Sequence, residues 1–125
     1  MITARSEKDI KFEKLQKIAI GAAKQCGASR LTKINEPIYL QDLKMDTLTI
    51  LAYEGEKAKT LKDITLGRFP SINLVVGAEG GFTEDEAAML TEKGALCVSL
   101  GKRILRTETA GIVLSSIVLY KAGSI

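Results

Sequence analysis

The sequence of 125 residues contains no histidine and only two cysteines. Histidine is the side chain that ordinarily titrates near neutral pH, so proton transfer in this protein must use Glu, Asp, Lys, Tyr, the backbone or water. No metal site is expected, because zinc sites are built mainly from cysteine and histidine. Cys26 and Cys97 fall at apolar positions of an expected helix and an expected strand, which predicts two buried, reduced thiols.

Long hydrophobic runs are also missing. No apolar run approaches the roughly 18 residues that a membrane-spanning helix requires, and residues 1–9 are too polar for a signal peptide. We therefore expect a cytoplasmic protein with no membrane partner. Repeats, low-complexity runs and linkers are absent too, so a chain of this length suits a single domain over residues 1–125.

Charge of one sign is not in large excess. Lys and Arg number 18 against 15 Asp and Glu, which gives a net charge of +3. Such a balance permits contact with RNA but does not by itself indicate it.

The first half of the chain contains one long amphipathic pattern. Ser6 and Asp9 suit a helix start, and Gly27 suits its end. Between them, one helical face collects the apolar residues Phe12, Leu15, Ile18, Ala19, Ala22, Ala23 and Cys26. A short strand over residues 30–34, an irregular or briefly helical segment over residues 37–43 and a more apolar strand over residues 47–53 are expected to follow.

The second half alternates helices with apolar strands. Thr60 and Asp63 suit the cap of a short helix, and Thr83 with Glu86 forms a capping box. The expected elements are a helix to residue 66, a strand over residues 72–76, a helix over residues 84–93, a strand over residues 96–100 and a last helix capped by Thr107 or Thr109. This order predicts an α/β fold with a mainly parallel sheet and helices on both faces.

The last helix is apolar on nearly every side. Its apolar residues are Ile112, Val113, Leu114, Ile117, Val118, Leu119 and Tyr120. Such a helix needs cover on two sides, which predicts a homodimer that buries the side left free by the sheet.

Two of the expected strands break directly into glycine, at Gly77 and at Gly101, as buried parallel strands do at a ligand-binding edge. The first loop matches neither the dinucleotide-binding spacing of glycines nor the P-loop. Glu79 and the acidic residues at 84–86 also place negative charge where a helix N-terminus would otherwise attract phosphate. A neutral or cationic ligand, such as an adenine ring joined to a sulfonium, suits this loop better.

Simpler interpretations of the same residues remain open. Gly80 and Gly81 also suit a plain tight turn before a capped helix. On the sequence alone, ordinary solvated charge is the favoured interpretation of Lys102, Arg103 and Arg106. Glu108 also suits a carboxylate that stabilises a helix start.

Three segments together resemble a known family. They are Gly77-Ala78-Glu79-Gly80-Gly81-Phe82-Thr83, the run from Ser99 to Ala110 and the helical segment from Lys17 to Gln25. They are similar to the signature of the SPOUT-class methyltransferases, and in particular to the family that methylates N3 of a uridine in 16S ribosomal RNA. The resemblance covers nearly all of the chain, and its second motif is highly specific.

The resemblance implies an α/β trefoil-knot fold that binds S-adenosyl-L-methionine, acts on 16S ribosomal RNA or the small ribosomal subunit, and works as a homodimer. It implies catalytic roles for Arg106, which would steady charge on the uracil oxygens, and for Glu108, which would position the base or accept its proton. The cofactor-binding residues that it implies are Leu51, Gly77, Ala78, Glu79, Gly80, Gly81, Leu100, Gly101, Ile104, Leu105 and Thr109.

The chain departs from the family at several points. Ala78 replaces a proline, Leu15 stands where tryptophan is usual, and Ala28 lies near the usual place of an arginine. The family's N-terminal RNA-binding barrel, and the first strand and helix of its methyltransferase domain, have no counterpart in the sequence. Two alternatives follow: a non-catalytic dimeric domain that binds the cofactor, or a methyltransferase of this class that acts on another RNA such as transfer RNA. The run from Ile104 to Ala110 argues against the second.

Overall fold

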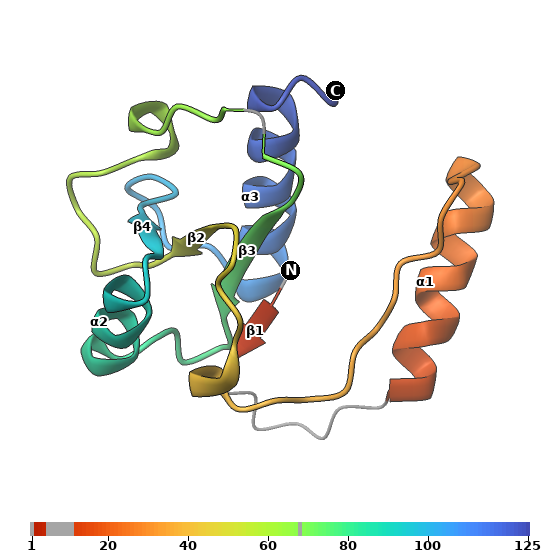
Figure 1. Ribbon diagram of the computed structural model, residues 1–125, viewed down its shortest axis with the longest axis horizontal. Helices are drawn as coiled ribbons and strands as arrows, with labels where there is room; N and C mark the ends of the chain where they lie inside the picture. The colour runs from red at the N-terminus through yellow and green to blue at the C-terminus, as the bar shows by residue number, and fades with distance from the viewer. Residues whose placement is uncertain (1, 5–11, 68) are drawn as a thin grey trace. The chain divides into compact units, whose positions relative to one another are not determined.

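The computed structural model describes residues 2–4, 12–67 and 69–125 (Figure 1). The chain forms two compact units. The helical unit is Glu7–Tyr39, and the sheet unit joins Met1–Ser6 to Leu40–Ile125.

The sheet unit is built on four parallel strands, β1 (Ile2–Ala4), β2 (Leu48–Ala52), β3 (Ile72–Gly77) and β4 (Leu96–Val98). Their order across the sheet is β1-β3-β2-β4. Because every neighbouring pair is parallel, each connection must cross over the sheet, and all strands end at the same edge. The predicted strands over residues 47–53, 72–76 and 96–100 are confirmed, and so is the parallel α/β class.

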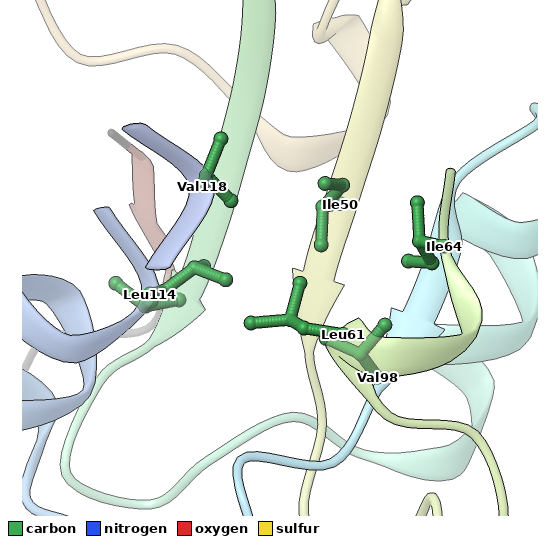
Figure 2. Close-up of a cluster of buried hydrophobic side chains, with 7 residues drawn as sticks. Ile50, Leu61, Ile64, Val98, Leu114 and Val118 are labelled. Atoms are coloured by element: carbon green, nitrogen blue, oxygen red, sulfur yellow. The ribbon is translucent and has the colours of Figure 1, made fainter. Parts of the chain in front are cut away.

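Helix α3 (Thr107–Lys121) covers one face of the sheet. Side chains alternate along a strand, so β2, β3 and β4 each send one buried side chain to this face. The buried cluster consists of Ile50, Leu61, Ile64, Val76, Val98, Leu114 and Val118, and Figure 2 shows how its labelled members converge between the sheet and the helix. Leu114 and Val118 belong to this cluster, so the side of α3 that carries them is buried.

Helix α2 (Glu84–Glu92) covers the opposite face. The neighbouring residues of the same strands, Leu51 and Val75, pack there against Ala87 and Leu90. Figure 1 shows α2 and α3 on the two sides of the sheet. The prediction of helices on both faces is therefore confirmed.

Helix ends agree with the sequence in two places and differ in one. Thr83 and Glu86 form the predicted capping box of α2, and Thr60 with Asp63 forms another at the short helix η2 (Leu61–Asp63). A brief turn, η1 (Leu40–Asp42), lies in the segment predicted to be irregular. The prediction that Thr107 or Thr109 caps the last helix is wrong: Arg106 is the N-cap, and in the described part of the chain its side chain makes no capping hydrogen bond. Here the apolar run of α3, rather than a cap, determines the helix.

The helical unit contains α1 (Phe12–Cys26), which confirms the first long helix. Gln16 ties the following segment to it, because its side-chain amide donates to the carbonyl of Thr32 (3.3 Å) and accepts from the N–H of Ile34 (3.4 Å). The strand predicted over residues 30–34 is wrong, since residues 31–39 have no regular secondary structure and most of their side chains are exposed.

The two thiols are less buried than expected. Cys26 is exposed and Cys97 is half-buried, so the prediction of two buried thiols is wrong. Cys26 belongs to a helix with few buried side chains. Among the α1 residues whose side chains are described, only Ala23 is buried, and Ile18 is 58% exposed.

Strand β1 was not predicted, because three residues are too few to show a periodic pattern. The helix start assigned to Ser6 and Asp9 lies outside the described residues. The trefoil knot stays a prediction. Among the helices that the structure describes, none is long and apolar enough to span a membrane.

Candidate functional site

Three loops meet at the edge where the parallel strands end. They follow β2 (residues 53–60), β3 (residues 78–83) and β4 (residues 99–106). Together they enclose a hollow of about 150 Å³, whose lining also includes Ala110 of α3. In open parallel sheets this edge is the usual place for a ligand.

The loop after β3 is held by a tight turn. The N–H of Gly81 donates to the carbonyl of Ala78 (2.9 Å), and Gly81 has a φ of +67°, which favours glycine. Gly77 has a different constraint: a Cβ there would lie 3.0 Å from backbone atoms of Gly81 and 3.3 Å from the ring of Phe82. The loop therefore folds back on its own backbone, and a side chain at residue 77 would push it open.

The start of α2 beside this loop is already capped. The hydroxyl of Thr83 accepts from the N–H of Glu86 (3.1 Å), and the carboxylate of Glu86 accepts from the N–H of Thr83 (2.9 Å). These bonds use backbone donors that an anion would otherwise bind, and they add a negative charge. The geometry agrees with the expectation that this loop does not bind phosphate.

The loop after β4 forms the apolar and basic part of the rim. Ser99 closes it, because its hydroxyl donates to the carbonyl of Gly101 (3.1 Å) and accepts from the N–H of the same residue (3.2 Å). Ile104 lines the hollow although it is 79% exposed. An apolar side chain at such a position is suited to contact with a bound ring.

The loop after β2 is the third wall. The N–H of Tyr53 donates to the carbonyl of Val98 (3.0 Å), which joins the ends of β2 and β4. The ring of Tyr53 lies so close to Gly55 that a Cβ at residue 55 would be 2.6 Å from the tyrosine hydroxyl oxygen. Farther along, hydrogen bonds from the backbone N–H groups of Lys59 and Ala58 lower the pKa of the Glu56 carboxyl below its usual 4.5.

The structure brings most of the sequence-predicted cofactor residues together. Those that line the hollow are Gly77, Ala78, Gly81, Leu100, Gly101, Ile104 and Leu105. Leu51 does not, because it lies in the core with no exposed surface. Glu79, Gly80 and Thr109 are exposed and lie beside lining residues rather than among them.

Arg106 and Glu108 are also exposed and do not line the hollow. Both flank it: Arg106 lies between the lining residues Leu105 and Thr107, and Glu108 follows Thr107 in the first turn of α3. Both are therefore neighbours of lining residues in the sequence, and their catalytic roles stay a prediction.

Several lining residues were missing from the sequence-based set. They are Ala52, Tyr53, Glu54, Lys57, Val76, Phe82, Ser99, Lys102, Arg103, Thr107 and Ala110. One signal would have found the first four. Residues 47–53 were predicted as a strand of a mainly parallel sheet, so the end of that strand and the residues after it reach the same edge as the glycine loops.

Two solved structures of similar fold hold S-adenosylmethionine. A putative methyltransferase from Legionella pneumophila, in complex with bound S-adenosylmethionine, matches with a TM-score of 0.83 and 32% sequence identity over 95% of this chain and 52% of its own. A ribosomal RNA small subunit methyltransferase E from Neisseria gonorrhoeae, also bound to S-adenosylmethionine, matches with a TM-score of 0.71 and 32% identity over 94% of this chain and 53% of its own.

Relatives found by sequence similarity carry the same name as the Neisseria gonorrhoeae protein. The ribosomal RNA small subunit methyltransferase E of Aquifex aeolicus is 39% identical over 113 residues, which cover 87% of this chain and 48% of the relative. The Bacillus subtilis protein of the same name is 31% identical over 121 residues, 89% of this chain and 47% of the relative. The chain thus spans about half the length of these relatives. The family model described as an RNA methyltransferase domain matches residues 1–119, so the chain belongs to that family.

Proposed function

We propose that the hollow binds S-adenosyl-L-methionine and that the chain is the methyltransferase domain of an enzyme acting on ribosomal RNA. The observation that carries this proposal is the meeting of three loops at one sheet edge, in a fold shared with proteins solved with that cofactor. The cofactor supplies an activated methyl group, and the chain's own residues bind, orient and align the reactants.

The residues present fit part of such a cofactor. Leu100, Ile104 and Leu105 offer an apolar wall for a ring. The loop after β3 adds the small residues Ala78 and Gly81 and the ring of Phe82. The volume of about 150 Å³ is smaller than the roughly 300 Å³ at which drug-sized ligand sites begin. We therefore expect one part of the cofactor to occupy the hollow and the rest to lie along its open rim.

Charge on the rim is mixed. Lys57, Lys102 and Arg103 line the hollow together with Glu54. A ligand that carries a carboxylate, an amine and a sulfonium finds partners of both signs there, whereas a phosphate finds the capped, acidic start of α2 on the neighbouring loop. Glu79 adds further negative charge close to the turn.

The substrate we propose is a uridine of 16S ribosomal RNA, methylated at N3. Support comes from the relatives, which are ribosomal RNA small subunit methyltransferases by name, and from the Ser99 to Ala110 motif. Arg106, which lies between two lining residues in the sequence, is the group that we assign to stabilise negative charge on the uracil oxygens as N3 loses its proton. Glu108 lies in the first turn of α3, and we assign it to orient the base or accept that proton.

We further propose that the chain works as a homodimer in the cytoplasm. The sheet covers only one side of α3, and on the other sides Ile112 is 68% exposed and Tyr120 is 73% exposed. Covering such a face with a second copy contributes several kcal/mol at about 25 cal/mol per Å². Ile117→Glu should convert the dimer to a monomer in light scattering. A native chain that is monomeric at high concentration would contradict this.

The catalytic assignment is tested by methyl transfer. Under single-turnover conditions, with the protein in excess over small ribosomal subunits, we expect transfer of a tritium-labelled methyl group. Arg106→Ala should lower its rate by about 100-fold, the usual effect of removing a group that stabilises developing charge, with little change in cofactor affinity. Arg30→Ala, an exposed arginine of the helical unit, is the matched control. Equal rates for the Arg106 and Arg30 variants would remove Arg106 from the mechanism.

A further inference from the structure

We propose that Glu56 is a positioning residue of the cofactor site: its carboxylate shapes the loop after β2 and fastens that loop to the loop after β4. The inference rests on the proposed cofactor function. Glu56 itself does not line the hollow, but it lies between Glu54 and Lys57, which do.

The first step is a local turn. One carboxylate oxygen of Glu56, Oε1, accepts from the backbone N–H of Ala58 (3.1 Å) and from that of Lys59 (2.8 Å). The N–H of Glu56 donates to the carbonyl of Tyr53 (3.2 Å). A single residue therefore fixes the backbone on both sides, from Tyr53 to Lys59.

The second step is a link between loops. Lys59, whose N–H is held by Glu56, uses its carbonyl to accept from the N–H of Ser99 (2.8 Å). Thr60 and Ser99 also form a parallel β-bridge. Because Ser99 closes the turn that carries Gly101, the turn at Glu56 holds two walls of the hollow in register.

Among the residues that the structure describes, no other side chain has a hydrogen bond to the backbone between Tyr53 and Lys59. From Thr60 onward the chain is held by Asp63, whose carboxylate accepts from the N–H of Thr60 (2.8 Å). The part between Tyr53 and Lys59 depends on Glu56, and hydrogen bonds to a charged acceptor are about twice as strong as neutral ones. The same two hydrogen bonds lower the pKa of the Glu56 carboxyl, because they favour its ionised form.

A positioning role makes a graded prediction. Glu56→Ala removes both hydrogen bonds, whereas Glu56→Gln keeps an acceptor oxygen without its charge. We expect S-adenosylmethionine affinity, measured by titration calorimetry at pH 7, to fall about tenfold in the alanine variant and less in the glutamine variant. Glu92→Gln, an exposed carboxylate at the end of α2, is the control for the loss of one negative charge and should bind as the wild type does.

Hydrogen exchange separates positioning from general destabilisation. In Glu56→Ala the amide of Ser99 should exchange faster, although it is 43 residues away in sequence, while amides of β3 keep their protection. Unchanged affinity in Glu56→Ala, or unchanged exchange at Ser99, would overturn the inference alone. A wild type that does not bind the cofactor would overturn the proposed function, and the inference with it.

Discussion

The loop after β3 and the loop after β2 both line one hollow, and their shapes depend on different interactions. At Gly77 and Gly81 the shape depends on missing side chains, because the backbone folds against itself and adopts a positive φ. Between Tyr53 and Lys59 it depends on a side chain that is present, the carboxylate of Glu56. One wall is fixed by close contact and the other by hydrogen bonds to a charge.

This difference predicts how each wall responds to change. Close contact between backbone segments has no slack, so an added atom must move the loop. Hydrogen bonds to a partly exposed carboxylate can be replaced in part by water, so their loss should loosen the loop without displacing it. The effects of substitutions in the two loops should therefore differ in magnitude and in their dependence on pH.

The largest effect is expected for Gly77→Val. Even a Cβ at this residue would lie 3.0 Å from the backbone of Gly81, so the larger side chain must open the turn. We expect S-adenosylmethionine affinity to fall by about 100-fold or more in titration calorimetry. The control is Gly21→Ala in α1, where nothing lies within 4 Å of the added Cβ, and where alanine should stabilise the helix by about 1 kcal/mol. Near-normal binding by Gly77→Val would show that the hollow is not the cofactor site.

A smaller effect is expected for Gly81→Ala. Here the space is open, and the cost comes only from the φ of +67°. The free energy of unfolding, measured in urea, should fall by about 1 kcal/mol, and the loss of cofactor affinity should stay well below that of Gly77→Val. An equal loss in the two variants would mean that backbone strain, rather than contact, determines the shape of this wall.

The smallest and most distinctive effect is the pH dependence at Glu56. A carboxyl whose pKa is lower in the folded protein stabilises the fold above its unfolded pKa, near 4.5, and this contribution is lost as the pH falls through the lowered folded value. The stability difference between wild type and Glu56→Gln in urea should therefore be constant near neutral pH and shrink below about pH 4.5. A difference that does not change with pH would show that the charge is irrelevant to the loop.

The sequence predicts most of the sheet unit because its signals there are redundant. The apolar run over residues 72–76 ends directly at a glycine, and Thr83 with Glu86 marks a helix start on its own. The errors fall where a signal is short or ambiguous. Strand β1 has only three residues, and residues 30–34 have strand-forming side chains but an exposed position.

The candidate site shows the same division. The apolar runs before the loops after β3 and β4 each end at a glycine, and this pattern is visible in the sequence, so both loops were predicted. Tyr53, Glu54 and Lys57 carry no such mark and become site residues only through the parallel pairing of β2 with its neighbours. A cofactor-binding role for Leu51 was implied by the resemblance alone, but its side chain is buried in the core. Periodicity places a residue on a strand, but the sheet order decides which loops become neighbours.

Titration of the protein with S-adenosylmethionine, followed at every backbone amide by NMR, tests whether the three loops after β2, β3 and β4 form one cofactor site. We expect saturable shifts in all three loops, at residues such as Tyr53, Gly81 and Gly101, with one common dissociation constant. Shifts that are absent, or that saturate in the two glycine loops while residues 53–59 stay unchanged, would contradict a single site built from all three loops.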